Sequence, residues 1–186
     1  MNDSVAAPNY DRELRVALEL AREAGDAILN LYDQDIEVQQ KYHLDLREPV
    51  TLADQIANDL IVNAIHREFP DDGVLAEESV DTDRRLGKRR VWMIDPLDGT
   101  NGFIDGNGDF AVQIGLSQDG AAVLGVVYQP LTGVLYRAVA GQGAWIERPD
   151  VQTTKARVSS QNNLAQMRLA ASRSHRSPSP SRSAGC

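Results

Sequence analysis

Two aspartates that follow an apolar segment have the spacing of a cation site. Asp95 comes directly after the apolar residues 92–94, and Asp98 follows three positions later in the string Asp-Pro-Leu-Asp-Gly-Thr. Pro96 keeps the chain extended, and Gly99 lets the backbone approach a ligand closely. Two carboxylates that converge beyond a strand repel each other unless a cation lies between them, and Mg²⁺ prefers such oxygen clusters together with a substrate phosphate. An isolated motif of this kind more often caps a turn. The choice between a turn cap and a metal site therefore depends on the other acidic segments of the chain.

Two other acidic segments lie at the ends of expected elements. Glu77 and Glu78 follow the apolar residues 73–76, where strand alternation sends one side chain inward and the other outward, so at most one needs a partner. Thr51 and Asp54 have the spacing of a capping box at the start of an expected helix. Taken alone, Asp54 is therefore interpreted as a cap, and the glutamates as a solvated strand end.

The hydrophobic pattern predicts an α+β layered domain. Apolar residues recur at helical spacing over residues 11–33 and 52–69, which predicts two amphipathic helices. Between them, residues 36–40 fit a short strand and residues 41–49 a polar loop. The period then changes to two, and strands are expected at residues 73–76, 90–94, 110–116, 122–129, 133–140 and 143–147. Turns with glycine or proline separate the later strands, which indicates an antiparallel meander rather than a Rossmann-type sheet.

Composition places the chain among soluble globular proteins. It has 186 residues, 42% hydrophobic and 25% charged, and its 27 acidic against 19 basic side chains give a net charge of −8. This acidity argues against a broad nucleic-acid-binding face. The longest apolar runs are too short to cross a bilayer, and residues 1–12 carry no signal-peptide core, so a cytoplasmic location is expected. A lone cysteine, Cys186, excludes an internal disulfide framework.

The end of the chain differs in character from the rest. Residues 172–186 contain six serines, three arginines and two prolines, with no acidic and no large apolar residue. Such a segment cannot offset the entropy lost on ordering, so we expect one domain over residues 1–171 and a disordered tail over residues 172–186. A less favoured alternative takes the tail as a nucleic-acid-binding or phosphorylation segment, although three arginines offer few phosphate contacts on so acidic a protein.

In combination, the three acidic segments resemble the signatures of the inositol monophosphatase family, whose members are lithium-sensitive, Mg²⁺-dependent phosphatases. The matching strings are Val-Thr-Leu-Ala-Asp at residues 50–54, Glu-Glu-Ser at 77–79 and Asp-Pro-Leu-Asp-Gly-Thr at 95–100. They occur in the family's order, and the resemblance covers residues 11–178. It implies a layered α/β sandwich of the sugar-phosphatase type, and it makes metal binding the preferred interpretation of the aspartates.

The resemblance also implies how the acidic residues would bind Mg²⁺. Glu77 and Asp95 would hold a first ion with the backbone carbonyl of Leu97, and Asp95 and Asp98 would hold a second. Two such ions about 3.5–4 Å apart generate hydroxide and neutralise the phosphate. They would also allow an acidic protein to use an anionic substrate, because metal ions reverse the local charge.

Catalytic and substrate-binding roles follow from the same resemblance. Thr100, hydrogen-bonded to Asp54, would help Glu77 orient and activate the attacking water. The backbone N–H groups of Gly99 and Thr100 would receive the phosphate. The predicted catalytic residues are thus Asp54, Glu77 and Thr100, and the predicted substrate-binding residues are Glu77, Leu97, Asp98, Gly99 and Thr100.

Later segments resemble one branch of the family, the bacterial 3′(2′),5′-bisphosphate nucleotidases. These segments cover residues 107–116, 122–130, 141–145 and 170–175. The branch implies removal of the 3′-phosphate from adenosine 3′,5′-bisphosphate, a small phosphorylated metabolite. Hydrolysis of inositol 1-phosphate and a non-catalytic role in binding metal or phosphate are the alternatives.

The resemblance leaves the family's C-terminal part unmatched. That part supplies a further α/β layer and a Trp-Asp-x-Ala segment whose aspartate completes the second metal site, whereas neither Trp92 nor Trp145 precedes an aspartate here. We therefore expect a weaker second metal site, activity well below that of a complete relative, and an exposed apolar sheet face that favours a homodimer. The change to serine, arginine and proline after residue 178 is typical of translation in another reading frame, a hypothesis that sequencing of the encoding DNA tests.

Overall fold

The computed structural model describes residues 9–32, 34, 37–43, 46–81 and 83–168, with the side chains of residues 42–48 excepted. The chain divides into a large unit, residues 1–156, and a small unit, residues 157–186. In the small unit, the described residues form irregular chain and a 3₁₀ turn, η2 (Leu164–Gln166). The predicted boundary between residues 171 and 172, and the tail that follows it, lie outside the described residues.

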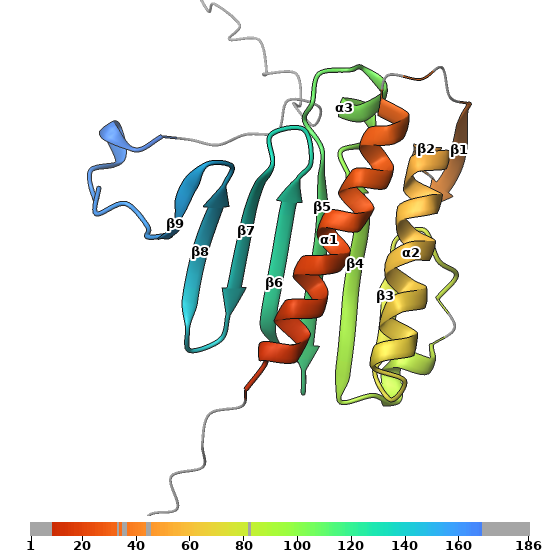
Figure 1. Ribbon diagram of the computed structural model, residues 1–186, viewed down its shortest axis with the longest axis horizontal. Coiled ribbons are helices and arrows are strands. Elements are labelled where there is room, and N and C mark those ends of the chain that lie inside the picture. Colours follow the sequence, from red (N-terminus) through yellow and green to blue (C-terminus); the bar gives the residue numbers. More distant parts are fainter. Residues whose placement is uncertain (1–8, 33, 35–36, 44–45, 82, 169–186) are drawn as a thin grey trace, which may run out of the picture. The chain divides into compact units, whose positions relative to one another are not determined.

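A mixed sheet runs through the large unit (Figure 1). Its seven strands among the described residues lie side by side in chain order: β3 (Gly73–Ala76), β4 (Arg90–Asp98), β5 (Ala111–Gln118), β6 (Ala121–Gln129), β7 (Val134–Val139), β8 (Gly143–Arg148) and β9 (Val151–Lys155). β3 and β4 are parallel, and each later pair is antiparallel. The predicted α+β class and meander are confirmed. β9 was not predicted, because its side chains are all exposed and leave no period of two.

Two long helices cover one face of this sheet (Figure 1). α1 (Asp11–Tyr32) and α2 (Leu52–Glu68) pack against each other, and α1 also contacts β5 and β6 while α2 contacts β4. Their apolar stripes meet the sheet in one core, in which Ile28, Ile61 and Trp92 are fully buried. Burial of side chains of this size contributes roughly 1.5–3 kcal/mol each. This packing therefore fixes β4 against α2, next to the end of β3.

The remaining helical segments of the large unit are short. η1 (Arg84–Gly87) lies in the connection before β4, and α3 (Thr100–Ile104) follows the end of β4. Of the helices in the described residues, none is long and apolar enough to cross a membrane.

A β-hairpin precedes α2 where the sequence predicts a polar loop. β1 (Val38–His43) pairs with β2 (Leu46–Thr51) in a two-stranded antiparallel sheet. The prediction of a loop over residues 41–49 was wrong, because pairing satisfies the backbone groups of two polar strands that carry no hydrophobic period. A strand was predicted at residues 36–40, and β1 begins within that range, at Val38. Residue 36 lies outside the described part of the chain.

The face of the sheet opposite α1 and α2 is apolar and, within the large unit, open. Leu75, Met93, Gly115 and Gly125 lie in register across four neighbouring strands. Alternation puts Met93 on the side opposite to the buried Trp92, and Leu75 and Met93 are 37% and 40% exposed. These residues border a hollow of about 510 Å³ that extends to the acidic ends of β3 and β4.

Candidate functional site

A β-bulge brings two aspartates to the same side of β4. Asp95 lies opposite Gln113 and Asp98 opposite Ala111, so three steps along β4 match two along β5. In a regular strand, residues three apart point to opposite faces, and the extra residue of a bulge removes that inversion. The Gln113 side-chain amide, opposite Asp95, accordingly donates a hydrogen bond to Oδ2 of Asp98. The two carboxylates therefore converge, and the bulge is the reason.

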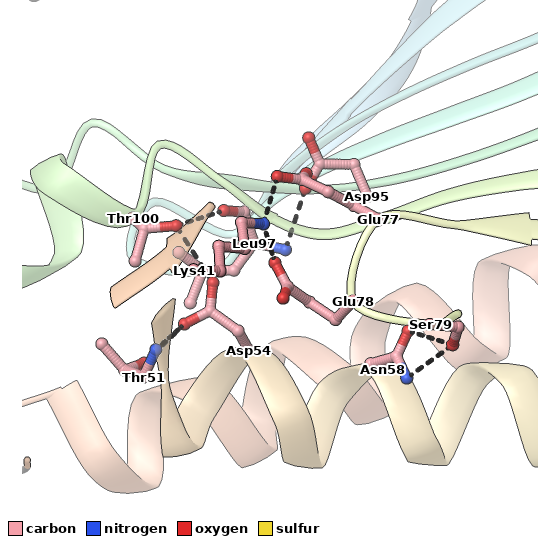
Figure 2. Close-up of polar contacts among 10 residues, drawn as sticks. All are labelled: Lys41, Thr51, Asp54, Asn58, Glu77, Glu78, Ser79, Asp95, Leu97 and Thr100. Atoms are coloured by element: carbon pink, nitrogen blue, oxygen red, sulfur yellow. Dashed lines mark hydrogen bonds and ion pairs between the residues drawn. The ribbon is translucent and has the colours of Figure 1, made fainter. Parts of the chain in front are cut away.

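Glu77 extends the parallel pair of strands and meets Asp95. Its backbone N–H donates to the carbonyl of Ile94 at 3.0 Å, which places its side chain beside the Asp95 carboxyl (Figure 2). Burial, the negative charges of Glu77 and Asp98, and contact with the Glu77 carboxyl raise the pKa of Asp95 to about 8. The Leu97 N–H, which donates to Asp95 Oδ1 at 3.2 Å, opposes this rise only in part. Three carboxyl groups thus crowd the ends of β3 and β4.

Asp54 joins the start of α2 to the start of α3. Its Oδ2 accepts hydrogen bonds from the Thr51 N–H at 2.7 Å and from the Thr51 hydroxyl at 2.6 Å, which completes a capping box. Its Oδ1 accepts a hydrogen bond from the Thr100 hydroxyl at 3.0 Å (Figure 2). Asp54 is 1% exposed; its contacts with Thr51 are buried, and the contact with Thr100 is partly buried. The interpretation of Asp54 as a cap is confirmed, and the same carboxylate also reaches the candidate site.

Gly99 allows the chain to pass from β4 into α3. It has a φ of +95°, and a Cβ at this position would lie 2.3 Å from the carbonyl oxygen of Asp109. Both the positive φ and the lack of space favour glycine. Thr100 follows as the first residue of α3, with its hydroxyl 3.3 Å from the Leu97 carbonyl oxygen. The Asp-Gly-Thr segment therefore holds the Thr100 hydroxyl and the Leu97 carbonyl next to the carboxylates.

Lys41 of the hairpin reaches the acidic cluster, and sequence reasoning missed this contact. Its ammonium group donates to Oε1 of Glu77 at 2.7 Å and also contacts Oε1 of Glu78 (Figure 2). The prediction that at most one glutamate needs a partner was wrong, because both bind Lys41. The alternation itself is present, since the Glu78 side chain is 9% exposed and the Glu77 side chain 44%. The contact was not predicted because Lys41 lies in residues 41–49, which the sequence predicts to be a loop.

The chemistry of these donors fits a hard divalent cation, although the side chains are not arranged around one. Among the described residues, no group of three or more acidic, histidine or cysteine side chains surrounds a common point. Lys41 holds Glu77, and Gln113 holds Asp98. Partial burial and the negative charges of Glu77 and Asp98 nevertheless raise the pKa of Asp95, as expected for a carboxyl group without a compensating cation. Mg²⁺ prefers carboxylate and carbonyl oxygens, and the Lys41 and Gln113 contacts here occupy one oxygen each of Glu77 and Asp98.

Comparison with known proteins connects this geometry to a family. The model of the inositol monophosphatase family matches residues 9–184. The chain belongs to the inositol monophosphatase family. The match includes all the predicted site residues, and it extends past residue 178, where the sequence motifs placed the end of the resemblance.

Curated relatives in this family carry different activities in their names. The 3′(2′),5′-bisphosphate nucleotidase CysQ of Salmonella typhimurium is 41% identical over 149 residues, which cover 77% of this chain and 60% of the relative. The histidinol-phosphatase of Chlorobaculum parvum is 40% identical over 143 residues, which cover 76% of this chain and 53% of the relative. The chain thus spans between half and two thirds of the length of these relatives.

Solved structures of family members have the same fold. The extragenic suppressor protein SuhB from Bartonella henselae superposes with a TM-score of 0.71 at 31% identity, over 81% of this chain and 56% of that chain. CysQ from Bacteroides thetaiotaomicron superposes with a TM-score of 0.62 at 37% identity, over 75% of this chain and 50% of that chain. The predicted family and its α+β fold are therefore confirmed, whereas the names of the relatives do not agree on one substrate.

Proposed function

We propose that this inositol monophosphatase family member is a Mg²⁺-dependent phosphomonoesterase that hydrolyses a small phosphorylated metabolite. The observation that carries the proposal is the contact between the carboxyl groups of Glu77 and Asp95 beside the Thr100 hydroxyl. The Leu97 N–H donates to Asp95, and the Leu97 carbonyl oxygen lies next to the Thr100 hydroxyl, which donates to Asp54. Membership of a phosphatase family supports the reaction class. The chain spans 60% or less of the length of the two curated relatives. Phosphatase activity of this chain is therefore proposed here and has to be tested.

Three acidic side chains and one carbonyl would hold the metal ions. Glu77, Asp95 and the Leu97 carbonyl form one proposed set, and Asp95 with Asp98 forms the other. Mg²⁺ bound there would lower the pKa of a bound water and neutralise the phosphate charge. Asp95 belongs to both sets, which agrees with its burial beside the other two carboxylates.

Groups of the chain itself would orient the attacking water. Asp54 Oδ1 accepts the hydrogen bond of the Thr100 hydroxyl, so the Thr100 oxygen keeps its lone pairs for a hydrogen bond from water. The Glu77 carboxylate, once released from Lys41, is the proposed acceptor of the water proton. The backbone N–H groups of Gly99 and Thr100 are proposed to receive the phosphate, as the family resemblance implies.

For the substrate, we propose adenosine 3′,5′-bisphosphate, with hydrolysis at its 3′-phosphate. The support is the identity of 41% with the CysQ nucleotidase and 37% with the solved CysQ structure. The 40% identity with a histidinol-phosphatase makes histidinol phosphate a second candidate, and the family name makes inositol 1-phosphate a third. A non-catalytic role in binding metal or phosphate is the remaining alternative.

The test compares phosphate release from these three substrates. The purified chain is incubated with each substrate and Mg²⁺, in parallel with the D95N variant and with an EDTA control. Release from adenosine 3′,5′-bisphosphate that requires Mg²⁺ and disappears in D95N is the expected result. Release from another substrate alone would correct the substrate but keep the reaction class. No release from folded protein would reject the enzyme and favour the binding role.

The homodimer and the cytoplasmic location are further proposals. The half-exposed Leu75 and Met93 on the open sheet face support self-association, because such apolar surface is stabilised by pairing. Light scattering over a range of protein concentrations tests this, and a monomer mass at all of them would contradict it. The net charge of −8 still argues against a nucleic-acid partner.

A further inference from the structure

Lys41 connects the hairpin to two glutamates that differ in exposure. The side chains of Glu77 and Glu78 are 44% and 9% exposed, and that of Lys41 is 22% exposed. An ion pair with an accessible carboxylate is worth little and exchanges readily. Breaking a pair with a buried carboxylate leaves a charge away from water, which is costly. The two contacts of Lys41 therefore differ in how easily they are given up.

The backbone that carries Glu78 is fixed from the helix side. The N–H of Ser79 donates to the carbonyl of Ala76 at 3.2 Å, which closes a turn after β3. The Ser79 hydroxyl and the Asn58 amide exchange hydrogen bonds of 3.1 and 3.3 Å (Figure 2). Asn58 belongs to α2 and is 5% exposed. These contacts hold the residue next to Glu78 in place without involving Glu77.

We propose that Lys41 is an internal cation that occupies Glu77 in the metal-free protein and stays on Glu78 when Glu77 binds a metal ion. Lys41 and Glu78 are thus positioning residues for the metal site. The inference rests on the proposed function, and it goes beyond it by assigning the hairpin a part in metal binding. It also agrees with the Lys41 contact on Glu77 and with the lack, among the described residues, of three such side chains placed to hold a metal ion.

Charge balance supplies the reason for this exchange. In the metal-free protein, the ammonium group compensates the Glu77 carboxylate beside the crowded Asp95 and Asp98. A divalent ion brings two positive charges to the same carboxylates, and a lysine that stayed on Glu77 would repel it. Glu78 offers the ammonium group a second, less exposed partner within contact distance. Lys41 can therefore release Glu77 without becoming unpaired.

The experiment is a double-mutant cycle measured by calorimetric titration of Mg²⁺ into the full chain, after removal of metal with EDTA. K41M removes the competing cation and should bind Mg²⁺ about tenfold more tightly. E78Q leaves Lys41 with Glu77 as its partner and should weaken binding about tenfold. In the K41M background, E78Q should change the affinity by less than about threefold, because its effect passes through Lys41.

Two further variants serve as controls for charge and for position. K88M makes the same change at an exposed lysine before β4 and should leave Mg²⁺ affinity within about twofold. E78D keeps the charge but shortens the side chain, so it should weaken binding as E78Q does. Circular dichroism shows whether each variant is folded, and K41A replaces K41M if the latter is not.

The outcomes separate this inference from the proposed function. No uptake of Mg²⁺ by the unsubstituted chain would overturn both. Uptake that is lost in D95N, with equal effects of E78Q in both backgrounds, would keep the metal site and overturn the exchange. Unchanged affinity in K41M would also overturn it, since Lys41 would then only attach the hairpin to the sheet.

Discussion

The hydroxyl of Thr100 donates a 3.0 Å hydrogen bond to Asp54, a residue 46 positions earlier in the chain. The other carboxylate oxygen of Asp54 accepts hydrogen bonds from Thr51. One buried side chain thus caps α2 and orients a hydroxyl at the candidate site. Its two oxygens have different partners, so substitutions of Thr100 and of Thr51 test the two roles separately.

Replacement of Thr100 by valine should remove most of the proposed phosphatase activity. Valine has a similar shape but offers the attacking water no oxygen, and contributions of this kind are about 10²–10⁴-fold in rate. We expect kcat to fall at least about 100-fold with little change in KM. T100S keeps the hydroxyl and should retain most of the activity. Steady-state kinetics on folded protein measure both, and equal rates for T100V and T100S would exclude a part for the hydroxyl.

Replacement of Thr51 by valine should act mainly on stability. It removes the side-chain oxygen that accepts a hydrogen bond from the Ala53 N–H at 3.2 Å and the hydroxyl that donates to Asp54. Loss of a helix N-cap costs about 0.5–2 kcal/mol. Urea unfolding should show a loss in this range for T51V and less for the matched variant T51S. A T51V protein as stable as the unsubstituted one would mean that water replaces the cap.

Replacement of Asp95 by asparagine should stabilise the metal-free protein. The pKa of Asp95 is about 8 in the fold against an ordinary value of 3.8, so the folded state binds a proton that the unfolded state releases between these pH values. Stability is therefore lost as pH rises from about 4 to 8, and above 8 the loss is complete. Asparagine does not ionise and avoids this loss.

Thermal melting in EDTA measures the effect of D95N. The variant should melt at least about 2–4 °C higher than the unsubstituted chain at pH 8, with a smaller difference at pH 5.5. Mg²⁺ should reverse the order, because ligand binding stabilises only the protein that retains the site. A variant that melts lower in EDTA at pH 8 would contradict the claim that buried negative charge destabilises this cluster.

Periodicity predicted the elements that carry a buried apolar face. The helices and most strands were found because residues such as Ile61 and Trp92 recur toward one core. The side chains of β9 and those of residues 38–40 in the hairpin are exposed, so the sequence showed no hydrophobic period for these strands. Backbone hydrogen bonds form them, and a sequence does not display those directly.

The candidate site was only partly accessible to such reasoning. Spacing drew attention to Asp95 and Asp98, but the bulge that aligns them depends on pairing with β5. The bond between Thr100 and Asp54 was expected from the family resemblance, since no local pattern connects residues so far apart. Lys41 was missed because its partners lie on a strand end that only the folded chain brings near the hairpin.

Replacement of Gly99 by alanine should disturb the site more than the same change at Gly106. Both glycines have positive φ, +95° and +66°, which costs alanine about 1–2 kcal/mol. An added Cβ meets nothing within 4 Å at Gly106, whereas at Gly99 it lies 2.3 Å from the backbone oxygen of Asp109. Relief of that overlap should lower the free energy of unfolding of G99A by about a further 1–3 kcal/mol. The shifted backbone carries Thr100, so Mg²⁺ affinity and activity should fall in G99A and persist in G106A. Urea unfolding measures the stability of the two variants, and Mg²⁺ titration measures their affinity. Equal losses of stability and of affinity in G99A and G106A would show that the chain relaxes freely at Gly99.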